Sequence, residues 1–176
     1  MTTRRATAIA DISAGFVARF AVALALLVAV PTSVANSNST YEGVASCAGS
    51  TCHGRFEGNG AVVRQDEIAT WQEPSSPSGA HSRAYAVLAS RRGQQIATSL
   101  GLGKATQAKE CLGCHATFVP SSQRGDRFQI SDGVGCESCH GASGGWLAAH
   151  YARPATHASN VANGLVPLEN PQVRAN

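Results

Sequence analysis

All six cysteines of this 176-residue chain lie in three short motifs, and a histidine follows the last cysteine of each motif. Cys-x-x-Cys-His is typical of covalent haem c attachment, in which two thiols bond to the two vinyl groups and the histidine binds the iron as proximal ligand. One motif has four residues between its cysteines, which lengthens the loop but keeps cysteine and histidine adjacent. The sequence therefore predicts three covalent haems c. The first, second and third motifs are Cys47-Ala-Gly-Ser-Thr-Cys52-His53, Cys111-Leu-Gly-Cys114-His115 and Cys136-Glu-Ser-Cys139-His140.

Zinc and disulfides are the alternative uses of so many cysteines. A structural zinc site uses Cys-x-x-Cys pairs without needing a histidine after each one, and three pairs with three histidines do not divide into four-ligand sites. A disulfide framework suits an exported protein but gives no reason for a histidine after every pair. The repeated Cys-His ending therefore favours haem.

The remaining histidines, His81, His150 and His157, are the candidates for distal iron ligands. Six histidines match three bis-histidine irons, and the only methionine is Met1, which leaves with the predicted signal peptide. His150 follows Trp146 by four residues, so on a helix the two rings share one face. His157 lies in a less ordered stretch, where a solvent-exposed histidine is the competing interpretation. If His157 is no ligand, one iron keeps an open site or takes another donor such as lysine.

The first 35 residues have the pattern of a secretory signal. Two arginines at positions 4 and 5 precede an apolar run at 20–30, and a small-residue sequence ends at Ala35. We expect cleavage after Ala35 and a periplasmic protein. The alternative is an uncleaved anchor, but the run has 11 uninterrupted apolar residues, whereas a membrane-spanning helix needs roughly 20.

Cleavage removes three of the 14 basic and one of the 11 acidic residues, which leaves a nearly neutral chain. Its densest basic spot is the pair Arg91-Arg92, so no cluster can follow a phosphate backbone. Nucleic acid is therefore excluded as a partner. We expect redox proteins as donor and acceptor, with a membrane-associated complex as a further option.

Short helices and loops must position the motifs, because strand signals are nearly absent. The expected fold class is mainly α with long loops, as one trihaem domain at 36–160 followed by a tail at 161–176. Apolar spacing and breaker residues predict helices at 78–93, from 104 into Cys111, and at 145–153, with an irregular stretch at 71–79 and a loop at 121–135 that includes an extended piece at 127–130.

The protein supplies little apolar material for a core. Aromatic residues make up 6% of the chain, and removing 35 of 176 residues leaves 141, or 47 per haem. Burial of apolar surface is worth roughly 25 cal/mol per Å², and each haem has two large apolar faces. We therefore predict a core formed by the haems and an apoprotein that does not fold.

Four stretches match the pattern of a known family: YEGVASC at 41–47, the segment 71–81, KECLGCH at 109–115, and GVGCESCHG at 133–141 followed by Trp146 and His150. They resemble the multihaem cytochrome c-552/4 family, the cytochrome c-554-like proteins. The resemblance implies distal-ligand roles for His81 and His150, and closely stacked haems with electron hopping between them. Relatives commonly carry a further motif, but no cysteine follows Cys139 here, and Asn170-Pro171 looks like the start of a helix, so we expect a truncated form.

Three functions remain open. The first is an electron carrier with bis-histidine haems, whose potentials are set by ligands and burial. The second is a haem module of a larger electron-transfer complex. The third is a redox enzyme of the nitrogen-oxide or hydroxylamine type, which needs an open iron position. Irons with two histidine ligands each have no open position for a substrate, which favours the electron carrier.

Overall fold

The structure is a computed structural model, and it describes residues 40–61 and 63–169. The chain divides into two units, Met1–Ser37 and Asn38–Asn176, and all described residues belong to the second. The predicted signal peptide and the predicted helix start at Asn170 lie outside the described residues.

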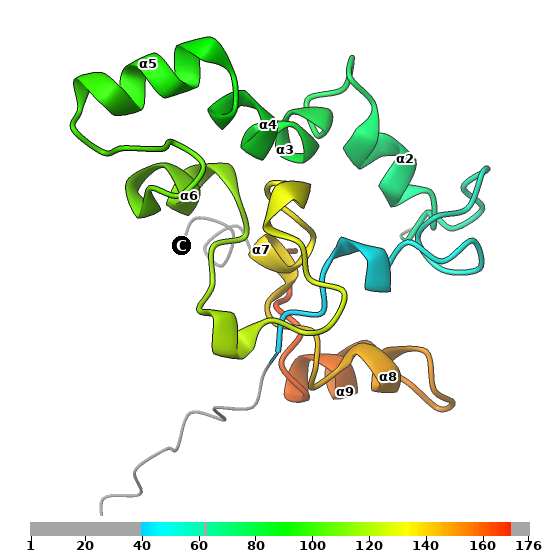
Figure 1. Cartoon of the computed structure of the whole chain (residues 1–176). Coiled ribbons are helices and arrows are strands. Elements are labelled where there is room, and N and C mark those ends of the chain that lie inside the picture. Colours follow the sequence, from blue (N-terminus) through cyan, green and yellow to red (C-terminus); the bar gives the residue numbers. More distant parts are fainter. Residues whose placement is uncertain (1–39, 62, 170–176) are drawn as a thin grey trace, which may run out of the picture. The chain divides into compact units, whose positions relative to one another are not determined.

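The described part is helical and contains no strand, which confirms the mainly α class (Figure 1). The piece predicted to be extended at 127–130 is extended only at Gln129 (φ −131°, ψ 119°), because Arg127 lies in a turn and a 3-10 helix begins at Ile130. An isolated parallel bridge forms instead between Tyr41 and Arg124, where the Tyr41 carbonyl accepts from Gly125 N–H at 2.9 Å. The elements are η1 (Val44–Ser46), α2 (Glu67–Gln72), α3 (Gly79–Ser82), α4 (Ala84–Leu88), α5 (Arg91–Ser99), α6 (Lys109–His115), η2 (Ser121–Gln123), η3 (Ile130–Asp132), α7 (Glu137–His140), α8 (Leu147–His150) and α9 (His157–Ala162).

The single helix predicted at 78–93 is wrong, because this segment holds α3, α4 and the start of α5. Arg83 has ψ −4°, which turns the chain between α3 and α4. Ser90 is extended, and its hydroxyl accepts the Gly93 N–H at 3.0 Å, so Ser90 is the N-cap of α5. A serine that bonds the backbone in this way starts a new helix rather than continuing the old one.

The other predicted helices exist but are shorter. α6 begins at Lys109 rather than near 104, because the side chain of Gln94 on α5 bonds Gly103 O at 2.7 Å and Ala105 N at 3.4 Å and holds this stretch as a turn. α8 covers only Leu147–His150 of the span predicted at 145–153.

Two helices, α2 and α9, were not predicted from the sequence. α2 includes the first two residues of the stretch expected to be irregular, and it ends at Gln72 because Glu73 precedes Pro74 and has an extended ψ of 114°. α9 begins with a capping box, in which Thr156 and Ser159 each bond the backbone of the other.

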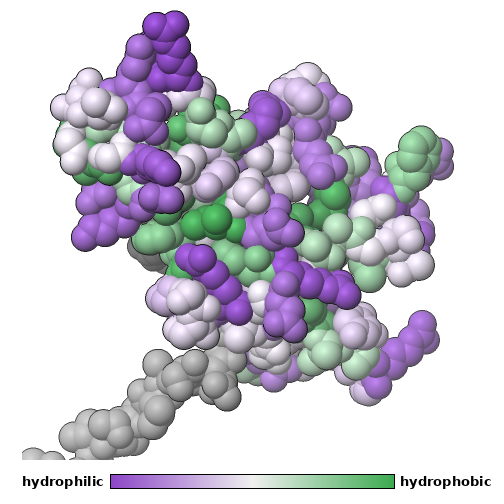
Figure 2. Space-filling model, viewed as in Figure 1, coloured by the Kyte–Doolittle hydropathy of each residue, from purple (hydrophilic) through white to green (hydrophobic). Residues whose placement is uncertain are grey.

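The core is small. Its main cluster lies where α4 packs against α5 and α6, and among the described residues four of the eight buried hydrophobic side chains are alanines. Larger hydrophobic residues such as Leu100 and Tyr151 are exposed at 65% and 70%, and green hydrophobic residues lie open among hydrophilic ones on the face in Figure 2. None of the described helices has the length and apolar character needed to cross a membrane.

Candidate functional site

The first motif folds its long spacer into two tight turns. Cys52 N–H donates to Gly49 O at 2.8 Å, and His53 N–H donates to Cys47 O at 3.2 Å. Gly54 permits this return, because a Cβ there would lie 2.2 Å from Ala48 O. The four-residue spacer therefore brings His53 back beside Cys47.

The second motif lies on α6, so Cys111 and Cys114 are one turn apart and His115 ends the helix. Cys111 is half-buried against the main core cluster, and Cys114 is exposed. The Nδ1 atom of His115 donates to Ala84 O on α4 at 2.8 Å. A ring fixed through Nδ1 keeps Nε2 available for a metal.

Four residues of the third motif, Glu137–His140, form α7. Cys136 precedes this helix, and Gly141, with φ +77°, follows it. Thr117 contacts this motif at two points. Its hydroxyl accepts the Gly135 N–H at 2.9 Å, just before the motif, and bonds the Ser138 hydroxyl at 2.7 Å within α7.

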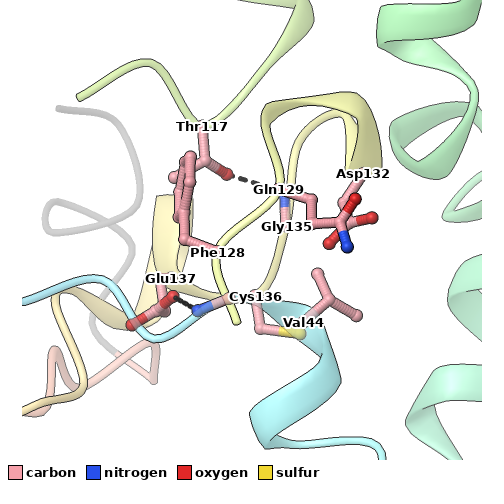
Figure 3. Close-up of a pocket in the computed structure, with 9 residues that line it drawn as sticks. Val44, Thr117, Phe128, Gln129, Asp132, Gly135, Cys136 and Glu137 are labelled. Carbon is pink, nitrogen blue, oxygen red and sulfur yellow. Dashed lines mark hydrogen bonds between the residues drawn. The ribbon is translucent and has the colours of Figure 1, made fainter. Parts of the chain in front are cut away.

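Glu137, inside the third motif, connects it to the chain around the first motif. Its side chain is 5% exposed and accepts three backbone N–H groups, from Glu42 at 2.9 Å, Gly43 at 2.8 Å and Ser143 at 2.9 Å. Figure 3 shows this carboxylate reaching the segment that carries Val44. Glu137 therefore joins the entry to the first motif with the exit from the third.

The first and third motifs are neighbours. A hydrogen bond to the Cys136 thiol, together with burial, raises the pKa of Cys47. Burial and then the positive charge of nearby His53 lower the pKa of His140. Beside the third motif lies a cavity of about 10 Å³, lined by Val44, Gln129 and Cys136 among others, which is room for about one water (Figure 3). This cavity is therefore too small to hold a haem.

His150 lies opposite His53, although 97 positions separate them in the sequence. The ring centroids are 6.3 Å apart and the ring planes differ by 14°. Metal–imidazole bonds are about 2.0 Å long and a ring centroid lies about 1.2 Å from its nitrogen, so two imidazoles on one iron have centroids about 6.4 Å apart. The observed separation fits that arrangement.

The surroundings of His150 fix its ring. Trp146 packs edge-on against it at 5.5 Å and 86°, which agrees with the shared face predicted from their spacing. The Nδ1 atom of His150 bonds the carbonyl of Leu147, which leaves Nε2 for a ligand bond.

The other two distal candidates lie in different surroundings. His81 is on α3 and its carbonyl accepts Val134 N–H at 3.0 Å, which brings it against the segment that enters the third motif. His157 is the first residue of α9, is 59% exposed, and has its Nε2 atom 3.5 Å from a carboxylate oxygen of Glu169.

Two carboxylates of the site were missed in the sequence. Glu67 bonds His53 at 3.0 Å, but it is 14 residues away and no motif marks it. Glu137 lies inside a motif, where a charged side chain between two attachment cysteines is expected to be exposed rather than buried.

The described residues fit covalent haem. All six thiols are free. Two buried donors close to the His53–His150 pair, Arg55 Nε and Trp146 Nε1, have no hydrogen-bond partner within the described ranges. Buried donors of this kind suit acceptors such as haem propionates. In the same ranges, no three His, Cys, Asp or Glu side chains converge to hold a metal ion by themselves.

A helical chain with paired free thiols and an imidazole directly after each pair has the features of a c-type cytochrome. A family model described as "Cytochrome c554 and c-prime" matches residues 46–141, which is more than half of the chain. The chain belongs to this family. Its membership implies covalent haem c and electron transfer. Comparison with curated proteins and with solved structures finds no match.

Proposed function

We propose that this chain is a periplasmic electron carrier with three covalent haems c, one at each motif. The main supporting observation is the His53–His150 pair, whose 6.3 Å separation suits two axial ligands of one iron. The hydrogen bonds from the backbone N–H groups of Glu42 and Gly43 to Glu137 hold the third motif beside the segment that enters the first, which supports close spacing of the first and third haems. Close spacing allows electrons to pass between haems without leaving the protein.

In this proposal each cysteine pair supplies two thioether bonds and the following histidine supplies the proximal ligand. His150 serves as the distal ligand opposite His53. The contact between His81 and Val134, two residues before Cys136, supports His81 as the distal ligand at the third motif. The haem irons would supply the reversible one-electron change, while the chain holds the imidazoles and limits the access of water.

Haem content tests the number of sites. A pyridine haemochrome assay on protein matured in the periplasm is expected to give three haems per chain. The double variant Cys111→Ala/Cys114→Ala is expected to give two, because it removes both thioether bonds at the second motif. A colourless product, or a double variant with unchanged haem content, would contradict the proposal.

Replacement of His150 by alanine is expected to open one iron. About one third of the haem should change from low-spin to high-spin and bind carbon monoxide when reduced, because six-coordinate bis-histidine iron resists that ligand. Absorption and electron paramagnetic resonance spectra measure both changes. The matched control is Tyr151→Phe, which keeps a ring 5.4 Å from that of His150 and should leave the spectra unchanged. An unaltered spectrum in His150→Ala would rule out His150 as a ligand.

The exposed position of His157 favours a second candidate function. Its contact with Glu169 occupies the Nε2 atom that a ligand bond would use. One iron, that of the second motif, would then keep an open position, which is what a redox enzyme needs. In that arrangement the unmodified protein already binds carbon monoxide with about one third of its haem. The unmodified protein in the His150→Ala experiment therefore distinguishes carrier from enzyme.

A further inference from the structure

Glu67 is attached to the proximal histidine of the first motif through both backbone and side chain. One of its carboxylate oxygens accepts the His53 Nδ1–H at 3.0 Å. The other accepts the Arg64 backbone N–H at 2.8 Å, which fixes the carboxylate. The next residue, Ile68, donates its N–H to the His53 carbonyl at 3.1 Å. The start of α2 therefore holds His53 in one orientation.

The neighbouring acid, Asp66, does not compete for this role. Its carboxylate makes two hydrogen bonds to the guanidinium of Arg64, at 2.8 and 3.1 Å. The acidic partner of His53 is Glu67, with the imidazole 33% and the carboxylate 44% exposed. A pair that is partly shielded from water keeps more of its interaction than a fully exposed pair.

The other histidines with described Nδ1 bonds have neutral partners. His115 donates to the carbonyl of Ala84, and His150 donates to the carbonyl of Leu147. A carboxylate is a stronger acceptor than a carbonyl because it carries a full charge. It draws the Nδ1 proton toward itself, makes the imidazole a more basic ligand, and so stabilises the oxidised metal more than the reduced one.

We propose that Glu67 is a positioning residue that lowers the reduction potential of the haem at the first motif relative to the haem at the second. This inference rests on the proposed function, since it needs His53 as an iron ligand. In consequence, the first-motif haem is oxidised before the second-motif haem and reduced after it. The carboxylate of α2 thereby gives the electron path an order that the three similar motifs alone do not contain.

The test is a spectroelectrochemical titration of the haem-loaded Glu67→Gln variant. The amide keeps the size of the side chain but removes its charge. One of the three midpoint potentials is expected to rise by about 59 mV, which corresponds to a tenfold change in the equilibrium constant of a one-electron reduction. The other two potentials should stay in place. The electron paramagnetic resonance signal of one low-spin haem should move with the same variant, which a purely structural role would not cause.

Two variants make the result specific. Glu57→Gln removes an equal charge from an exposed position in the same loop and should move no potential. Glu67→Asp keeps the carboxylate and should stay closer to the unmodified protein than Glu67→Gln does. Unchanged potentials in Glu67→Gln, or an equal shift in Glu57→Gln, would overturn the inference. The haemochrome count on the unmodified protein is separate: fewer than three haems defeats the proposed function, whereas three haems with no shift defeats only the role of Glu67.

Discussion

Made without haem, the chain is expected to show no cooperative unfolding transition. The longest described helix, α5, has nine residues, and isolated helices shorter than about 12–15 residues are marginal in water. Packing must therefore stabilise the helices, yet half of the buried hydrophobic residues in the described part are alanines, which bury little area. The side chains alone do not supply enough buried surface to offset the chain entropy lost on folding.

The experiment uses a variant with all six motif cysteines changed to alanine, followed by calorimetry and by circular dichroism in the far and near ultraviolet. The matched control is the unmodified sequence produced in the absence of haem, which separates loss of the thiols from loss of the cofactor. Both proteins should lack a sharp melting transition, whereas the haem-loaded protein should show one. A cooperative transition in the haem-free unmodified chain would mean that the polypeptide forms its own core.

The exposed aromatic residues support the same expectation. Phe56 is 97% exposed and lies three residues after His53, and the ring of Tyr151 is 5.4 Å from that of His150. Large exposed hydrophobic side chains beside the proposed ligands are reasonable where a cofactor face covers them. Bound haem would then cover hydrophobic side chains that the polypeptide itself leaves exposed.

The attachment residues could be predicted from the sequence because each motif is local. Thiol, thiol and imidazole lie within seven residues at the first motif and within five at the others, so their adjacency needs no knowledge of the fold. The helical class was also predictable, since breakers and apolar spacing act over a few residues. The subdivision of 78–93 was not, because Ser90 fits a helical pattern until its hydroxyl bonds the Gly93 N–H.

The pairing of His53 with His150 and the carboxylates that support the motifs depend on tertiary structure, so neither could be predicted from the sequence. The number of histidines indicated that His150 is an iron ligand. It did not indicate that His53, 97 residues away, lies opposite it. Glu67 contacts His53 only because the loop between them returns the chain to the motif. The burial of Glu137 requires three amide groups, two from the distant segment at Glu42 and Gly43 and one from Ser143 six residues further on, and the motif itself gives no sign of them.

Replacement of Glu137 by alanine is expected to lower the free energy of unfolding of the haem-loaded protein by about 3–5 kcal/mol. A hydrogen bond to a charged group is worth about 1.5–3 kcal/mol, and a buried donor without a partner costs about 1–3 kcal/mol. Glu137→Ala removes the acceptor of three backbone donors, of which those of Gly43 and Ser143 are in buried surroundings. Water entering the space would offset part of the cost, so the sum of the individual terms is an upper bound.

The measurement is equilibrium unfolding in guanidinium chloride, followed by far-ultraviolet circular dichroism and by the Soret band. Glu137→Gln should lose about half as much stability, because its amide oxygen can still accept while its NH₂ group would face a backbone donor. Glu110→Ala is the matched control, since Glu110 also adjoins the first cysteine of a motif but is exposed, and we expect a change of about 0.5 kcal/mol or less.

Glu137→Ala is also expected to change the electron paramagnetic resonance spectrum. Glu137 bonds the backbone at Glu42 and Gly43 from within the third motif, so its loss should alter the spacing of the first and third haems and not only the stability. Magnetic coupling between two haems, seen by electron paramagnetic resonance, should therefore weaken in Glu137→Ala and persist in Glu110→Ala. Equal stability and equal coupling in both variants would show that the two motifs are held together by the haems themselves rather than by this carboxylate.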